Sequence, residues 1–316
     1  MTVLPRLLLR TGVFVLSTVV ASVLVFGFMA VLPGDPAAVA LGVNPSPEAL
    51  TQLRAEYGTD RPLVAQYLSW VGGLLRGDFG RSYVTHDLVG PQIADRLQVT
   101  LWLVGLGMVV SVALAVPFGA LAAVWHRRVG GVLLAGVSQV GVAVPSFIAG
   151  ILLVDILAVR LGWFPSGGWT PPAEDPAGFA SHIVLPVASL GLVQAAVLTR
   201  YVRSAVLDVM REDYLRTARA KGLGPYRALL RHGLRNAAIP VVTVLGLQLA
   251  TLLIGAIVVE RVFVVPGLGS LLLDSVANRD LLAVQGVVMV LVLAVLAVNY
   301  AVDVLYTVLD PRLRAR

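Results

Sequence analysis

The chain has 316 residues, of which 58% are hydrophobic and only 13% are charged. Because soluble domains carry about a quarter charged residues, this composition excludes an ordinary soluble protein and indicates an integral membrane protein. The formal net charge of +6 indicates no nucleic-acid partner, since basic cytoplasmic loops and contact with the anionic lipid of the bilayer account for such an excess.

Residue types exclude several kinds of chemistry. The chain has no cysteine, and its four histidines lie on different segments, so we expect no disulfide, no catalytic residue and no metal site. Lys221 is the single lysine, and it does not stand in the Gly-x-x-x-x-Gly-Lys-[Ser/Thr] pattern of a phosphate-binding loop. If the protein is driven by ATP, the ATPase must therefore be another polypeptide.

Apolar runs predict an all-α integral membrane protein with six transmembrane helices. Each run approaches or exceeds the roughly 20 residues that a helix needs to cross the hydrocarbon core. The first is too long for a secretory signal and lacks a small-residue cleavage site before Pro33, so we expect it to remain as a span. The predicted spans are Thr11–Leu32, Thr100–Trp125, Val132–Val159, Ile183–Leu207, Ala237–Val259 and Leu281–Leu309.

The charge distribution predicts the orientation. With six spans both termini lie on one side, and if that side is the cytoplasm, 16 of the 24 basic residues fall inside. The positive-inside rule favours this arrangement. We therefore expect cytoplasmic N- and C-termini in a bacterial cytoplasmic membrane, and a strongly basic cytoplasmic loop at residues 203–236.

A polar insertion of about 65 residues follows the first span and is expected to be extracytoplasmic. Ser46 is a typical N-cap for a short helix at Pro47–Tyr57, and an amphipathic segment at Pro62–Leu75 precedes a Gly77–Gly80 turn. The chain is thus divided into residues 1–98, the first helix with this insertion, and residues 99–316, a five-helix core. Arg160–His182 and Glu260–Asp280 are expected to be further outward loops, the latter with a turn at residues 265–269.

Several polar residues lie within the predicted spans and are candidates for a translocation path. The alternative for the uncharged ones is hydrogen bonding between helices, and for the acidic one an ordinary ion pair near a span end. These residues are Gln139, Ser146, Asp155, Gln194, Gln248, Gln285 and Asn299.

A short helix is predicted inside the basic loop, at Asp213–Gly222, with Asp213 as N-cap and Gly222 as its stop. Tyr214, Leu215, Ala218 and Leu223 supply an apolar element, and Ala218 with Ala220 would let another backbone approach closely. A docking surface for a soluble partner is the favoured interpretation. The alternative is a solvated basic loop that holds anionic lipid head groups.

These residues resemble a known family. The pattern Arg216-Thr-Ala-Arg-Ala-Lys-Gly222, followed by Leu230-Arg-His-Gly-Leu-Arg-Asn-Ala-Ala-Ile-Pro240, is similar to the coupling loop of ABC-importer permeases, most of all in the dipeptide/oligopeptide/nickel branch. Arg216 and Thr217 stand where the general importer signature has Glu and Ala, a departure that also resembles this branch. Further similar segments, in the same order along the chain, are Leu32–Pro36, Val144–Phe147, Gly162–Ser166, Leu185–Ser189, Arg200–Arg203 and Glu260–Phe263 with Pro266–Gly269.

The resemblance implies a type I ABC-importer permease fold and a set of partners. These are a second, homologous permease subunit in a heterodimer, two cytoplasmic ABC ATPase domains and an extracytoplasmic solute-binding protein. ATP and Mg would act in the ATPases, and this chain would bind no cofactor. Coupling to an ATPase is assigned to Asp213, Tyr214, Leu215, Arg216, Thr217, Ala218, Arg219, Ala220, Lys221, Gly222 and Leu223.

Short di- and oligopeptides are the cargo that the resemblance implies. Nickel, glutathione or another small solute would use the same machinery. Two other classes stay open. One is a secondary carrier or channel working alone, against which the scarcity of mid-span charge argues. The other is a scaffold or sensor that binds a cytosolic protein through the same loop without transport.

Overall fold

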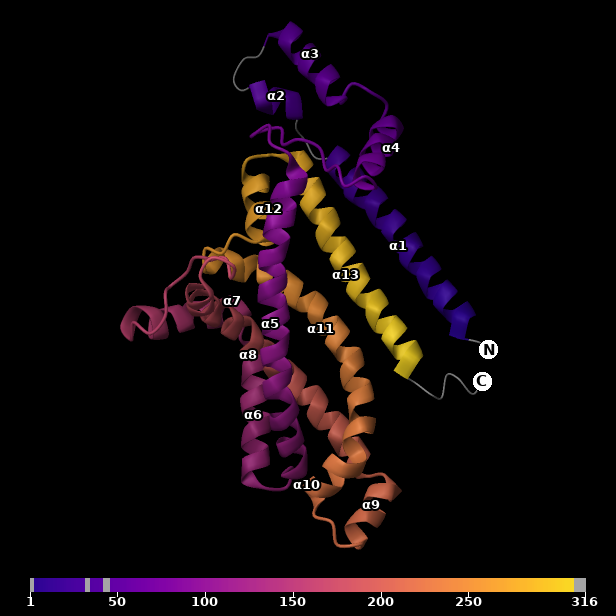
Figure 1. Ribbon diagram of the computed structural model, residues 1–316, viewed down its shortest axis with the longest axis vertical. Helices are drawn as coiled ribbons and strands as arrows, with labels where there is room; N and C mark the ends of the chain where they lie inside the picture. The colour runs from indigo at the N-terminus through magenta and orange to yellow at the C-terminus, as the bar shows by residue number, and fades with distance from the viewer. Residues whose placement is uncertain (1–2, 32–34, 42–45, 310–316) are drawn as a thin grey trace. The chain divides into compact units, whose positions relative to one another are not determined.

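The computed structural model describes residues 3–31, 35–41 and 46–309, and all of its regular elements there are helical (Figure 1). The elements are α1 Val3–Val31, α2 Pro36–Leu41, α3 Pro47–Tyr57, α4 Leu63–Leu74, α5 Val89–Val124, α6 Val129–Ala143, α7 Ser146–Leu153, η1 Val154–Arg160, α8 Pro176–Met210, α9 Asp213–Ala220, α10 Pro225–Ala228, η2 Leu229–Gly233, α11 Leu234–Val262, α12 Leu268–Ala277 and α13 Leu281–Leu309. The two η elements are π-helical. The expected all-α architecture is confirmed.

Helices α1, α5, α8, α11 and α13 are long and apolar enough to cross a membrane. Proline lies inside three of them, at Pro117, Pro186 and Pro240, as membrane helices tolerate when neighbouring groups satisfy the freed carbonyls. The third span is not the continuous helix that the sequence predicted. It consists of α6 and of α7 with η1, which meet at an angle of 99°.

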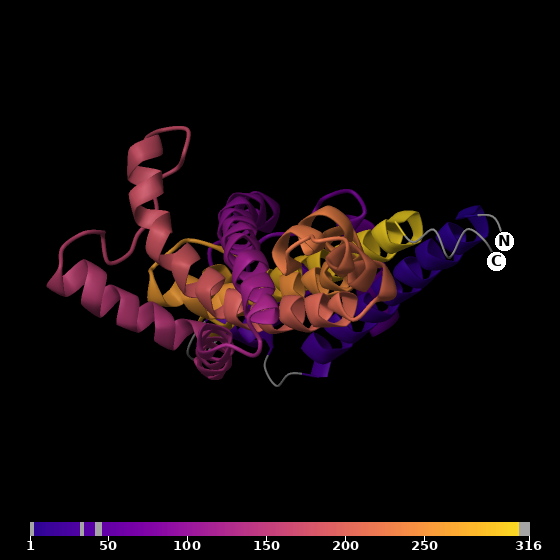
Figure 2. The same ribbon diagram turned by 90° about the horizontal axis from the view of Figure 1, so that it is seen from below.

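The bend in the third span has a local cause. Pro145 lacks the N–H that would continue the helix, and it forces Val144 into an extended conformation with φ −90° and ψ 119°. The helix stops at Ala143 and restarts at Ser146, and the change of direction can be followed in Figure 2. Counting this pair as one broken span gives the six predicted spans.

The chain divides into two compact units. The core unit contains Thr100–Val265 with the described parts of residues 1–8 and 298–316. Helix α8 is its centre and packs along α11 and against α6 and α7. At Gly119 of α5 a Cβ atom would lie 2.7 Å from Cβ of Val202 in α8, so only glycine permits this close helix approach.

The insertion unit contains Leu9–Val99 and Pro266–Ala297. The expected helix α3 is confirmed with its cap, since Ser46 Oγ accepts a hydrogen bond from Ala49 N at 3.2 Å. The amphipathic segment forms α4, where Tyr67 contacts α1 through a 2.9 Å hydrogen bond between Tyr67 Oη and Ser22 Oγ. An apolar cluster built around Val89, Ile93 and Val287 joins the start of α5 to α12 and α13.

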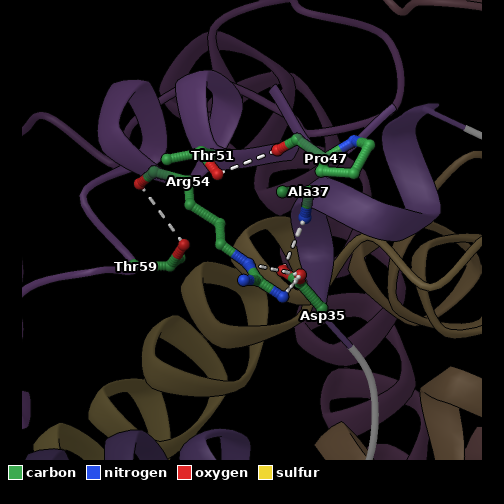
Figure 3. Close-up of polar contacts among 6 residues, drawn as sticks. All are labelled: Asp35, Ala37, Pro47, Thr51, Arg54 and Thr59. Atoms are coloured by element: carbon green, nitrogen blue, oxygen red, sulfur yellow. Dashed lines mark hydrogen bonds and ion pairs between the residues drawn. The ribbon is translucent and has the colours of Figure 1, made fainter. Parts of the chain in front are cut away.

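An ion pair holds α2 and α3 together in the insertion unit. Asp35 accepts a hydrogen bond from Ala37 N at the start of α2 and pairs with Arg54 of α3, whose Nη2 lies 2.8 Å from Asp35 Oδ2 (Figure 3). The predicted outward loop at Glu260–Asp280 is mostly helical, which corrects that expectation. Helix α11 continues to Val262, and α12 occupies Leu268–Ala277.

Candidate functional site

The helix predicted in the basic loop is present as α9, between α8 and α11 in chain order. Its first helical residue is Asp213, and the N-cap position belongs to Glu212, whose side chain makes no capping hydrogen bond. Asp213 is therefore not the N-cap that the sequence predicted. Its carboxylate lies in the first turn, where its negative charge interacts favourably with the positive end of the helix dipole. Its Oδ1 is 3.6 Å from Arg216 Nη1.

The inner face of α9 is fixed to its own chain. Leu215 is 2% exposed and Ala218 8% exposed, and both pack in a small cluster with Ala228 of α10 and with Val209 and Met210 at the end of α8. Ala218 thus does not present a surface for an approaching partner, contrary to the expectation for this residue. Because the cluster includes the last turn of α8, a displacement of α9 would be transmitted to a long apolar helix.

The C-terminal end of α9 is closed by a Schellman motif. Gly222 adopts φ +91°, its N–H donates to Arg219 O at 2.9 Å, and Leu223 N donates to Ala218 O at 3.3 Å. Leu223 also packs in the cluster with Ala218, the apolar contact that accompanies this motif. The predicted stop at Gly222 is confirmed, since a left-handed conformation favours glycine.

The outer face of α9 is polar and basic. Arg216, Thr217, Arg219, Ala220 and Lys221 are all exposed. Tyr214 is 39% exposed, and its Oη accepts a 2.8 Å hydrogen bond from Asn236 Nδ2 near the start of α11. The basic side chains Arg211, Arg227, Arg231 and Arg235 of the same loop are also exposed. The outer face of α9 is thus a cationic ridge, on which Arg216, Arg219 and Lys221 are exposed.

Within the core unit the residues proposed for a translocation path do not form a single cluster. Gln194 of α8 and Gln248 of α11 are buried together, and Gln194 Nε2 donates to Gln248 O at 3.3 Å. Ser146 begins α7, while Gln139 of α6 and Asn299 of α13 are exposed. Asp155 forms a 2.7 Å ion pair with Arg160 within η1, and Gln285 is 7% exposed in the insertion unit.

Sequence reasoning missed a buried carboxylate at the end of α11. Glu260 was expected in an outward loop, but its exposure is 0%, and it accepts a 2.6 Å hydrogen bond from Thr100 Oγ1 of α5. One turn on, Phe263 is fully buried, and its backbone oxygen accepts a hydrogen bond from Gly168 N. The similarity of the Glu260–Phe263 segment to ABC-importer permeases was the one signal in the sequence that singled out Glu260.

Two family models match the chain. The model described as the binding-protein-dependent transport system inner membrane component matches residues 115–315. The model for the N-terminal part of binding-protein-dependent transport system membrane components matches residues 3–104. Together they span nearly the whole chain.

Similar proteins carry transport names. The glutathione transport system permease protein GsiC of Escherichia coli (strain K12) is 42% identical over 295 residues, which are 93% of this chain and 94% of that protein. A Brucella abortus (strain 2308) protein, named provisionally as a peptide transport system permease protein, is 40% identical over the same share of both chains.

A solved structure supports the fold. A chain of the inward-facing MetNI methionine ABC transporter matches with a TM-score of 0.56 and 17% identity, over 69% of this chain and 96% of that chain.

Proposed function

The chain belongs to the family of binding-protein-dependent transport system inner membrane components and is an ABC-importer permease, and we propose that its cargo is short peptides. The observation that carries the proposal is the 42% and 40% identity, over 93% of this chain, to permeases named for glutathione and for peptides. Glutathione is itself a tripeptide, so both names indicate solutes that carry peptide bonds and free carboxylates.

The partners follow from this role. The permease would pair with a second, homologous permease subunit, as membership of this importer family implies. Helix α6 is consistent with such pairing, since it exposes an apolar row at Val132, Leu133, Val137 and Val140. A solute-binding protein would deliver the peptide on the extracytoplasmic side, and two cytoplasmic ABC ATPase domains would bind ATP with Mg.

Helix α9 is the proposed coupling element. Its inner face is anchored to α8 and α10 by Leu215 and Ala218, and its outer face carries the exposed residues Arg216, Arg219 and Lys221. In the orientation favoured by the basic residues, with both termini in the cytoplasm, this ridge meets an ATPase groove. ATP-driven closure of the ATPase pair would move α9 and the linked ends of α8 and α11 as one body.

The movement would switch the path between inward-facing and outward-facing states. ATP favours one state by binding it more tightly, and the loaded binding protein acts in the same way from the other side. Gln194 and Gln248 lie where α8 and α11 pack together, so a relative movement of these helices would change the surroundings of both amides. We propose that the polar residues of the spans line the path and that their surroundings change as the helices move.

Reconstitution tests the proposal. The chain, its partner permease and the ATPases are placed in liposomes with the binding protein, and ATP-dependent uptake of labelled tri-alanine is measured beside labelled glutathione and nickel. We expect saturable tri-alanine uptake that unlabelled dipeptides inhibit. Uptake of nickel that peptides do not inhibit would contradict the cargo, and transport by this chain without ATPases would contradict the coupling.

A further inference from the structure

The insertion unit contains a cavity that the importer role does not account for. It lies among α1, α3, α4, the segment from Asp78 to His86 and the start of α13, and its volume is about 420 Å³. Sites for small molecules in proteins have volumes of about 300–1,000 Å³. All of its lining residues belong to the insertion unit.

Three residues in its wall carry buried polar atoms that lack a hydrogen-bond partner: Tyr57 Oη, Trp70 Nε1 and Gln285 Nε2. Six such side-chain atoms occur in the part of the chain that the structure describes, so half of them surround one cavity. The indole N–H and the amide nitrogen only donate. A buried donor without a partner costs about 1–3 kcal/mol, and an acceptor placed in the cavity would remove that cost.

The wall carries two arginines, Arg61 and Arg81, and two carboxylates, Glu56 and Asp78, so an anionic acceptor depends on an arginine that is not already paired. In the described part of the chain the guanidinium of Arg61 makes two hydrogen bonds, both long, from Nε to Gly58 O at 3.4 Å and from Nη1 to Ser69 Oγ at 3.5 Å. Among the described residues it takes part in no ion pair. Its guanidinium is therefore available for a carboxylate, which it can bind in bidentate geometry.

The aromatic part of the wall keeps its protons at neutral pH. The rings of Tyr57 and Tyr83 stack with centroids 4.3 Å apart. Burial, and next the neighbouring Tyr57, raise the pKa of Tyr83 to about 12, and burial also raises the pKa of Tyr57. Tyr57 can thus donate a hydrogen bond, while Phe26 and Trp70, with ring centroids 6.0 Å apart, offer apolar contact.

We propose that this cavity binds a small carboxylate-bearing molecule of amino-acid to tripeptide size. Trp70 Nε1 and Gln285 Nε2 donate to the carboxylate, and Arg61 balances its charge. The amide of Gln285 ends a side chain with three rotatable bonds, so it can turn toward a ligand. The inference rests on the proposed peptide cargo for the choice of probe, and it adds a binding site in the insertion to the path between the permeases.

Equilibrium dialysis with the purified full chain tests the site. Labelled tri-alanine is compared with tri-alanine amide, which lacks the carboxylate. We expect the free acid to bind at least about tenfold more tightly, the ratio that corresponds to one hydrogen bond to a charged group. Equal binding of acid and amide would overturn the assignment of a carboxylate, and binding of neither would overturn the site.

Variants locate the binding in the cavity. Trp70→Phe keeps the ring that packs on Phe26, and Gln285→Leu keeps the volume, and each should weaken tri-alanine binding about tenfold. Ser111→Ala removes a buried unpartnered hydroxyl of α5 that does not line the cavity and should leave binding unchanged. Binding that survives the Trp70→Phe/Gln285→Leu double substitution would place it elsewhere and overturn the proposal.

The melting temperature of the protein without ligand gives a second test, which does not depend on peptide binding. Without ligand, Gln285→Leu removes a buried donor that has no partner, so the melting temperature should rise. A fall would mean that ordered water already satisfies the amide, which contradicts the proposal. If the reconstituted importer carries tri-alanine while the purified chain binds none, the cavity inference fails and the proposed cargo stands.

Discussion

Ser82 Oγ donates a 2.5 Å hydrogen bond to Oδ2 of Asp280, a residue 198 positions further along the chain. The other carboxylate oxygen accepts from Tyr83 N at 3.2 Å and from Ala283 N at 3.4 Å. Asp280 is only 5% exposed and directly precedes α13. One buried carboxylate thus caps the last helix and fastens the loop before α5 to it, within the insertion unit.

Replacing Asp280 should loosen this attachment. Asp280→Asn puts an NH₂ group where one of the three donors now finds an oxygen, and hydrogen bonds to charged groups contribute about 1.5–3 kcal/mol. We expect the free energy of unfolding to fall by about 2–3 kcal/mol, measured by thermal unfolding in detergent. Asp95→Asn is the control, because Asp95 is exposed. Equal stability of the two variants would contradict the anchoring role.

Alkaline pH should weaken the insertion unit. The pKa of Tyr83 is raised from 10.0 to about 12, so between these values the unfolded chain loses a proton that the folded chain keeps. Stability is therefore unaffected below about pH 10 and falls by about 2 kcal/mol as the pH rises to 12. Tyr83→Phe should remove most of this loss in unfolding measured against pH, whereas Tyr226→Phe, at an exposed position, should not.

Local signals predicted some elements well. Helix α3 begins and ends where the Ser46 cap and the following pattern indicated, and α13 has the predicted bounds. Both are set by residues close in sequence, a cap in one case and a long, mostly apolar run in the other. The Gly222 stop was predictable for the same reason.

Features that depend on distant packing were not predicted. Pro145 breaks the third span, whereas Pro117, Pro186 and Pro240 lie inside continuous helices, and nothing local separates the two cases. Glu260 was expected to begin an outward loop, but it lies inside α11, where it is buried and accepts a hydrogen bond from Thr100 of α5. Ala218 and Ala220 are the same type of residue, and only the packing of α9 in the fold decides which of the two alanines is buried.

Gly222 should be required for coupled transport. Its φ of +91° costs an L residue about 1–2 kcal/mol, so Gly222→Ala should displace the end of α9 and lower ATP-dependent uptake about fivefold or more. Gly222→Asn should retain more uptake, because Asn tolerates this conformation better. Gly224→Ala is the matched control, since Gly224 has φ −61° and open space around it. Equal uptake by the Gly222→Ala and Gly224→Ala variants would contradict the coupling role.

The two faces of α9 should respond differently to a bulky side chain. Ala220→Trp adds volume on the exposed face, so the protein should accumulate normally but lose co-purification with its ATPase. Ala218→Trp forces the same volume into the buried cluster, where overpacking costs about 1–3 kcal/mol or more, and it should lower the melting temperature. Retention of the ATPase by the Ala220→Trp variant would mean that the partner binds elsewhere.

Thr100 should stabilise the core unit through the buried carboxylate of Glu260. Thr100→Val keeps the shape of the side chain but removes the hydroxyl that donates at 2.6 Å, leaving Glu260 with one donor fewer at 0% exposure. We expect a loss of about 1–3 kcal/mol in the free energy of unfolding. Thr100→Ser, which keeps the hydroxyl, should recover most of it.

Thr51→Val provides the comparison, because Thr51 also donates a hydrogen bond but from an exposed position, to Pro47 O at 2.8 Å. Water can replace that bond, so the substitution should change stability by less than about 0.5 kcal/mol. If Thr100→Val were as mild as Thr51→Val, other donors would suffice for Glu260. The hydroxyl of Thr100 would then contribute no net stability to the contact between α5 and α11.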